Sequence, residues 1–304
     1  MKLSVKKNSV RKKKQKNTDA WKDRLTSASF LAPSLTGVLV FFILPFLVVI
    51  YYSMVDNPIS HNFVFFQNFV NVLKNAAFRK AAMNTLQFSA VAVPLAVLLS
   101  LGLAILLESK IPFKSQFRTF FLSPMMVPVA SVVLIWQVLF HYNGVVNDFL
   151  GNFGIQAIDW LKSEHGKIVL VLLFLWKNLG YNMILFMAAL GNIPQDILEV
   201  ARLDTSSSLQ IFFRIKIRYL SATLLFVTIF SLINSFKVFR EIYLLTNDYP
   251  YDSVYMLQHF MNNTFENLDY QKLSAAAIIM AVVIVILIGI LFIAEDKFGK
   301  DVEG

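Results

Sequence analysis

The chain has 304 residues, of which 57% are hydrophobic and only 15% are charged. Soluble domains have about 45–50% apolar and about 25% charged residues, so this composition favours an integral membrane protein. The sequence contains no cysteine, which excludes disulfides and cysteine-ligated metal sites, and its four histidines lack the spacing of metal ligands. Ten of the 28 Lys and Arg residues precede residue 29, so the net charge of +9 reflects a basic tail and does not indicate nucleic-acid binding.

Six apolar segments are long enough to cross a bilayer as helices, each of which needs roughly 20 residues. They lie at 29–53, 86–107, 119–140, 168–190, 219–239 and 274–294. These runs are far longer than the strands of a membrane barrel, so the predicted fold class is all-α, a six-helix transmembrane bundle. The first segment ends at Tyr51-Tyr52 instead of a small-residue cleavage site, which predicts a retained anchor. Prolines inside spans predict kinks at Pro45, Pro94, Pro124 and Pro128.

The basic residues between the spans predict the orientation of the chain in the membrane. With six spans, the tails and the loops 108–118 and 191–218 share one side, which holds 19 Lys and Arg residues, whereas the opposite loops hold 7. Both termini are therefore expected on the cytoplasmic side. The N-terminal tail carries most of this difference.

The segment between the fourth and fifth spans has a pattern that the other loops lack. Pro194 followed by Asp196 is typical of a helix start, because Pro fits the first turn and a carboxylate complements the positive end of the helix dipole. A short helix is predicted from about 195 to 204, and the hydroxyl-rich run 205–208 should end it. A second amphipathic helix should then lead into span five. On these residues alone, an interfacial amphipathic connector is an equally good interpretation.

Glu199-Val200-Ala201, followed by Asp204, resembles the Glu-Ala-Ala (EAA) loop of binding-protein-dependent ABC importer permeases. The lead-in Ile193–Leu198 is similar to that family as well. Tracts at the fifth and sixth spans, 235–239 and 267–270, resemble the sugar-type permeases in particular. The likeness extends over nearly the whole chain and implies the type I importer permease fold, in the plasma membrane of a prokaryote.

Two residues depart from the family pattern. Thr205 stands where the family usually has Gly, and a β-branched residue adopts the positive φ of such a turn poorly. The turn is therefore expected to differ in shape, or the helix to continue. Arg218 stands where the family usually has Pro, which should let span five begin as an uninterrupted helix.

The resemblance implies a set of partners and a mechanical role. In this family a second permease completes the pathway, two ATPase subunits hydrolyse ATP on the cytoplasmic side, and an external solute-binding protein delivers the cargo. The second permease of sugar-type relatives is usually a different chain. The chain itself is expected to bind no cofactor or metal and to be no enzyme. The coupling segment 193–213 should dock on the ATPase, with these residues involved: Glu199, Ala201, Arg202, Asp204 and Thr205.

Polar residues inside spans usually face a bundle interior, and sugars are bound by aromatic stacking with amide and hydroxyl hydrogen bonds. Candidates for the substrate pathway are Asn178, Asn182, Asn234, Ser235, Trp136 and Phe236. The alternative for each polar residue is a hydrogen bond between helices. Lys177 and Lys237 lie near span ends, where they could extend to the interface, and Lys237 could serve an outer gate.

The predicted organisation is a basic tail (1–28), a first span with an external loop (29–80), a permease domain (81–295) and a cytoplasmic tail (296–304). Two alternatives concern the function. The cargo could be a solute other than a sugar, such as glycerol phosphate. An ion-coupled secondary transporter is less well supported, because the predicted spans lack a central Asp or Glu.

Overall fold

The computed structural model describes residues 26–299 apart from 58, 109–111, 206 and 247–249. Within these residues the secondary structure is helical except for one isolated β-bridge, between Val55 and Phe63. Five helical stretches are long and apolar enough to cross a membrane: Thr26–Ser53, Ala76–Glu108, Gly166–Gly191, Ser221–Thr246 and Tyr270–Lys297. The tails predicted at 1–28 and 296–304 lie largely outside the described residues.

The elements in chain order are η1 (Leu39–Ile43), α2 (Leu44–Ser53), α3 (Gln67–Lys74), α4 (Ala76–Glu108), α5 (Lys114–Met126), α6 (Val129–Leu139), α7 (Val145–Gly151), α8 (Gly166–Gly191), α9 (Gln195–Asp204), α10 (Ser208–Ile211), η2 (Phe212–Lys216), α11 (Ile217–Tyr219), α12 (Ser221–Phe236), α13 (Phe239–Thr246), η3 (Asp252–Val254), α14 (Leu257–Glu266) and α15 (Tyr270–Gly299).

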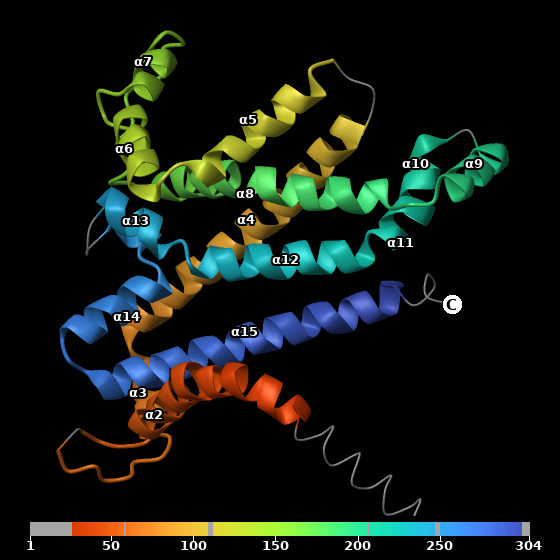
Figure 1. The fold of residues 1–304 in the computed structure, drawn as a ribbon. Helices are drawn as coiled ribbons and strands as arrows, with labels where there is room; N and C mark the ends of the chain where they lie inside the picture. The colour runs from red at the N-terminus through yellow and green to blue at the C-terminus, as the bar shows by residue number, and fades with distance from the viewer. Residues whose placement is uncertain (1–25, 58, 109–111, 206, 247–249, 300–304) are drawn as a thin grey trace, which may run out of the picture.

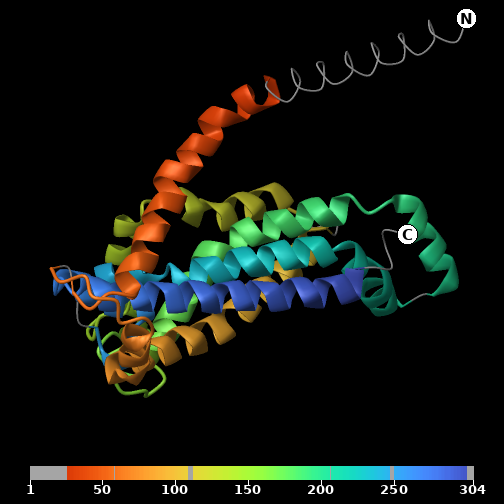
Figure 2. The same ribbon diagram turned by 90° about the horizontal axis from the view of Figure 1, so that it is seen from below.

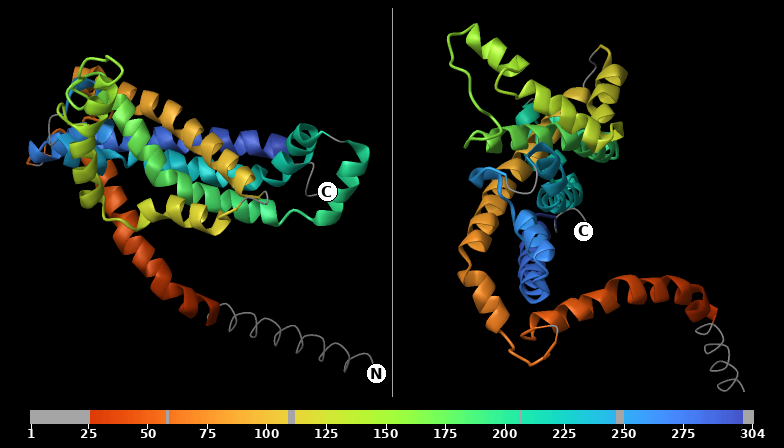
Figure 3. Two further views of the ribbon diagram at one scale, coloured as in Figure 1. Left: turned by 90° about the horizontal axis from the view of Figure 1, so that it is seen from above. Right: turned by 90° about the vertical axis from the view of Figure 1, so that its left-hand side faces the viewer.

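The four long helices α4, α8, α12 and α15 lie side by side in an elongated bundle (Figures 1 and 2). The buried face of α4 combines larger apolar residues with several small ones, which are Ser89, Ala92, Ala96, Ser100 and Ala104. Small residues let helix backbones approach closely, which replaces the hydrophobic drive that lipid does not provide. The N-terminal helical stretch stands apart and packs mainly through α2 against α15 (Figure 3).

The third predicted span, 119–140, is wrong as a single helix. α5 and α6 meet at a bend of 102°. Pro128 is the N-cap of α6, and Val127 before it has an extended backbone, since the residue preceding a proline is driven out of the helical conformation. The predicted kink at Pro128 is thus confirmed, but it is strong enough to turn α6 and α7 away from the bundle (Figure 1).

Close approach of α5 to α8 depends on one glycine. A Cβ atom at Gly180 would lie 1.9 Å from the carbonyl oxygen of Phe121, far inside van der Waals contact. The backbone of α5 therefore rests directly on α8 at this point.

The fifth span is longer than predicted and is broken. α12 ends at Phe236, Lys237 and Val238 form a turn, and α13 begins at Phe239. The stretch Ser221–Thr246 extends beyond the predicted boundary at 239, so that Glu241 lies inside it. This acidic residue lies near the end of the stretch, whereas the prediction concerned an Asp or Glu at the centre of a span.

Candidate functional site

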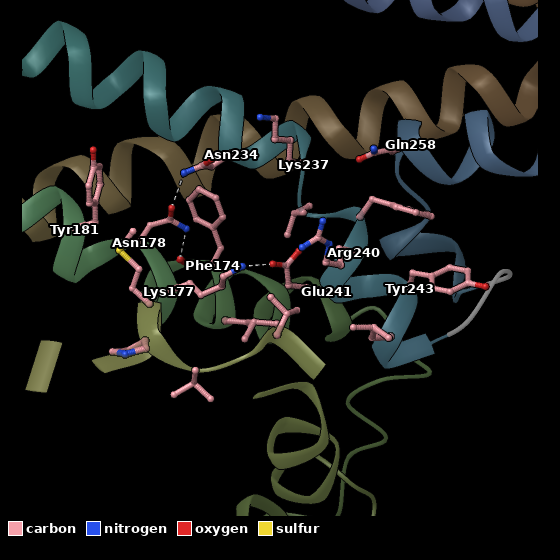
Figure 4. A pocket seen from close by; sticks show the side chains of 18 of the residues that line it. Phe174, Lys177, Asn178, Tyr181, Asn234, Lys237, Arg240, Glu241, Tyr243 and Gln258 are labelled. Atoms are coloured by element: carbon pink, nitrogen blue, oxygen red, sulfur yellow. Dashed lines mark hydrogen bonds and ion pairs between the residues drawn. The ribbon is translucent and has the colours of Figure 1, made fainter. Parts of the chain in front are cut away.

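A cavity of about 1080 Å³ lies where the bend between α5 and α6 meets α8, α12, α13 and α14 (Figure 4). Among the described residues, its walls combine apolar side chains with amides, aromatic rings and four charged groups. The charged lining residues are Lys177, Lys237, Arg240 and Glu241. The broken fifth span supplies three of these four, which explains why the break matters for the site.

Lys177 of α8 and Glu241 of α13 form an ion pair across the cavity wall (Figure 4). Glu241 is buried, at 6% exposure, whereas Lys177 is partly exposed. A buried carboxylate needs such a partner, because an unpaired charge in a low-dielectric environment is costly. Lys177 is thus held inside the bundle, which corrects the prediction that it extends to the interface.

Two of the predicted pathway amides meet at the cavity. The Nδ2 group of Asn234 donates to Oδ1 of Asn178 at 2.9 Å, and Nδ2 of Asn178 donates to the carbonyl of Phe174 at 2.8 Å. Both amides line the cavity and remain partly exposed. This pair links α8 to α12 and still presents polar atoms to a bound molecule.

Two aromatic pairs also line the cavity. The rings of Tyr181 and Phe230 have centroids 4.9 Å apart, and those of Phe239 and Tyr243 are 5.4 Å apart. The first pair bridges α8 and α12, and the second lies on α13. Aromatic faces next to amide groups are a suitable surface for sugar rings.

The other predicted pathway residues lie outside the cavity walls. Asn182 and Ser235 are fully buried in contacts between helices, through Asn182 Nδ2 to Ser231 Oγ at 2.9 Å and a Ser89–Ser235 hydroxyl pair at 2.7 Å. Trp136 stacks on Phe140 with centroids 5.2 Å apart. Phe236 packs against the core cluster of α4, α8 and α12. Asn182 and Ser235 therefore follow the alternative interpretation, hydrogen bonding between helices.

Sequence reasoning missed Arg240, Glu241 and Gln258 as lining residues. Arg240 and Glu241 lie just past the predicted end of span five, and Gln258 comes from the short helix α14. Nothing in their local pattern marks them, because only tertiary packing brings α13 and α14 to α8. The one available signal was the excess of polar residues in the second half of span five.

At the opposite end of the bundle, α9 projects with α10 (Figure 1). Its bounds, Gln195–Asp204, agree with the predicted helix 195–204. Leu198 and Ala201 are buried, and Leu198 packs in the cluster that joins α4, α8 and α12. Val200 and Leu203 are instead exposed, at 59% and 87%, together with the charged residues Glu199, Arg202 and Asp204. The helix thus presents a mixed apolar and charged surface away from the chain.

Thr205 ends α9 with an extended backbone, at φ −149°. The positive φ of the glycine turn is absent, and the helix does not continue past Asp204. The Thr205 hydroxyl donates to Oε1 of Gln210 at 2.7 Å and accepts from the Ser207 N–H at 3.2 Å. Side-chain hydrogen bonds therefore shape this turn in place of a glycine.

The second helix of this loop leads into span five as predicted, although not in one piece. A π-helical turn, η2, interrupts it, and Leu220 separates α11 from α12 by one residue. The uninterrupted start of span five expected from Arg218 is therefore wrong. Lys216 in η2 forms an ion pair of 2.7 Å with Glu108 at the end of α4. This pair ties the projecting segment to the same end of the bundle.

These features define a multi-pass membrane protein with a polar cavity among its spans and an exposed amphipathic helix at one end. The family described as binding-protein-dependent transport system inner membrane component matches residues 92–302, and the chain belongs to this family. It is accordingly a transport permease and a multi-pass protein of the cell membrane, as the sequence resemblance predicted. No group of metal-binding side chains occurs among the described residues.

Several curated proteins are similar over most of their length. A sulfoquinovosyl glycerol permease of Agrobacterium fabrum is 28% identical, covering 85% of this chain and 86% of that protein. A trehalose/maltose permease of Thermococcus litoralis is also 28% identical, with 89% and 93% covered. A lactose permease of Rhizobium radiobacter is 31% identical, with 71% and 74% covered. A solved bacterial ABC transporter for alginate import has the same fold, with a TM-score of 0.79, 20% identity, and 92% and 98% covered.

Proposed function

We propose that this chain is one permease subunit of an ATP-binding cassette importer for sugars or oligosaccharides and forms half of its translocation pathway. The observation that carries the proposal is the cavity between α8, α12 and α13, in which amides and aromatic rings face the same space. Relatives named for sulfoquinovosyl glycerol, trehalose/maltose and lactose transport support a sugar cargo.

The segment 193–213 is the proposed coupling device. Its buried residues Leu198 and Ala201 fix α9 to the bundle, while Glu199, Arg202 and Asp204 remain exposed to meet an ATPase subunit. Apolar contact through Val200 and Leu203 would give affinity, and the charges would set register and partner choice. ATP is hydrolysed by the partner.

The proposed assembly contains this chain, a second and different permease, two ATPase subunits and an extracytoplasmic solute-binding protein. One related structure was solved with a periplasmic protein bound to an alginate pentasaccharide, which supports the last of these partners. The proposal includes cytoplasmic positions for both termini and a permease domain at 81–295, as the sequence predicts. The bilayer surrounds the spans.

A second candidate cargo is a phosphorylated polyol, since a glycerol-3-phosphate permease of Salmonella typhimurium is 28% identical over 84% of this chain. Glu241 does not favour a secondary transporter, because its carboxylate is already paired with Lys177.

Deletion of the gene that encodes this chain, in its host, tests the proposal. Uptake of radiolabelled sugars should fall to the background in the deletion strain and return with the chain in trans. The chain should also co-purify with an ATPase and a second permease. Active uptake by the purified chain alone, without ATP, would contradict the importer role.

A further inference from the structure

We infer that the cargo of this cavity is a sugar or oligosaccharide that carries an acidic group, held by Lys237 and Arg240. The inference rests on the proposed function and narrows its substrate class. It depends on the balance of charge around the cavity, on the break in span five, and on an acceptor at Gln258.

The described residues that line the cavity carry an excess of positive charge. Three of them are cationic, Lys177, Lys237 and Arg240, and one, Glu241, carries a carboxylate. Lys177 is already paired with that carboxylate. Within the described part of the chain, Lys237 and Arg240 have no ion-pair or hydrogen-bond partner for their side chains, and both are exposed. Two cations are therefore available to a bound molecule.

Because Lys237 and Arg240 are exposed, water solvates both charges while the cavity is empty. A neutral sugar entering the cavity would displace water from Lys237 and Arg240 and leave both charges without a counter-ion. A carboxylate, phosphate or sulfonate supplies that counter-ion. Arg is particularly suited to the task, since its planar guanidinium can donate two parallel hydrogen bonds to such a group.

The turn that separates α12 from α13 adds to the positive electrostatic potential of this wall. The first N–H groups of a helix have no acceptor within it, and they carry the positive end of its dipole. α13 begins at Phe239, which lines the cavity between Lys237 and Arg240. Figure 4 shows the two cationic side chains here, with Lys237 beyond Asn234 and Arg240 near Glu241. The helix start and the two cationic residues thus belong to one short stretch of chain, 237–240, on the same wall of the cavity.

Neutral parts of the cargo also find partners. Gln258 lines the cavity, and its Oε1 atom is buried without a hydrogen-bond partner among the described residues. It can accept from a sugar hydroxyl. The amide pair Asn178–Asn234 and the rings of Tyr181 and Phe230 lie on another part of the wall. The cavity therefore offers sites for both a sugar ring and an acid group.

The experiment offers cells a mixture and identifies what they import. The mixture contains oligogalacturonides, their uncharged methyl esters, maltodextrins and a hexose phosphate. Mass spectrometry of the medium compares the host with the strain lacking this chain.

Chain-dependent depletion of the oligogalacturonides or of the hexose phosphate is expected, and which of the two is depleted distinguishes a carboxylate from a phosphate cargo. Depletion of only the esters or maltodextrins would contradict an acidic cargo and would still support the proposal that the chain belongs to a sugar importer. Chain-dependent depletion of none would overturn the proposed function itself.

Variants then assign the acid group to its binding residues. In Lys237→Gln/Arg240→Gln, uptake of the acidic sugar should fall by roughly tenfold or more, because two charged hydrogen-bond donors are lost. The control Lys74→Gln/Lys162→Gln removes the same charge from exposed residues outside the cavity and should take up the sugar as the parent does. Co-purification with the ATPase verifies that both variants assemble. Equal uptake by the two double variants would overturn the assignment.

Discussion

At the scale of single residues, Gly180 sets how closely α5 can approach α8. Gly180→Ala would place a methyl group 1.9 Å from the Phe121 carbonyl oxygen, so the two helices must separate. Overpacking of this kind costs about 1–3 kcal/mol. A lower melting temperature of the purified protein in detergent is therefore expected, together with weaker transport, since α5 forms part of the cavity wall.

Gly102 provides the matched control for this substitution. It lies within α4, and a Cβ atom there would meet nothing within 4 Å. Gly102→Ala should keep or slightly raise the melting temperature, because Ala favours a helix over Gly. If both variants melted alike, the backbone contact at Gly180 would not be the cause.

The Lys177–Glu241 pair makes a second prediction at this scale. Lys177→Met would leave a buried carboxylate without a counter-ion, which typically costs about 3–5 kcal/mol. The variant should be markedly less stable to heat. Lys177→Met/Glu241→Gln removes both charges and should recover much of the loss, and a double variant no better than the single would argue against the pair.

The cavity wall contains some residues that the sequence could predict and others that it could not. Asn178 and Asn234 were predictable from the rule that polar residues in spans face inward, and the structure joins them at 2.9 Å. The same rule selected Asn182 and Ser235, which bond between helices, because a pattern cannot distinguish a buried contact from a cavity wall. Glu241 and its partner Lys177 are 64 residues apart, so only the packing of α13 on α8 reveals their pairing.

At the scale of elements, α9 was predictable because its signals are local. The proline start and the hydroxyl-rich end place α9 at Gln195–Asp204, as expected. Long apolar runs likewise located the spans. The bend between α5 and α6 was underpredicted, since a proline signals a kink but its angle depends on what the two helices pack against.

The exposed position of Glu199 on α9 leads to a prediction about coupling. Glu199→Lys reverses a charge on the surface proposed to meet the ATPase, while the buried residues Leu198 and Ala201 keep the helix in place. Transport should fall by more than about tenfold, with ATP hydrolysis by the complex persisting, since like charges brought together at an interface can cost several kcal/mol.

Uptake and phosphate release measured in the same proteoliposomes separate these two effects. Glu164→Lys makes the identical change in the exposed loop before α8 and should leave both rates as they are. Normal uptake in Glu199→Lys would remove Glu199 from the coupling mechanism.

At the scale of the whole molecule, the bundle has two ends that differ in character. One end carries α9, α10 and the Lys216–Glu108 pair, and the other carries α6, α7 and α14 (Figures 1 and 3). The distribution of basic residues predicts that the first end is cytoplasmic. Because the chain has no cysteine, single cysteines introduced at exposed positions report on each end without a background signal.

Gln195→Cys, at the start of α9, and Asn152→Cys, just after α7, are suitable probes because both side chains are exposed. In intact spheroplasts, a membrane-impermeant maleimide should label only Asn152→Cys, and disruption of the membrane should expose Gln195→Cys. Labelling from outside at both positions would mean that α8, which lies between them, does not cross the membrane. The reverse pattern would invert the bundle and place α9 where no ATPase could reach it, so this measurement decides whether the coupling and cavity proposals can hold together.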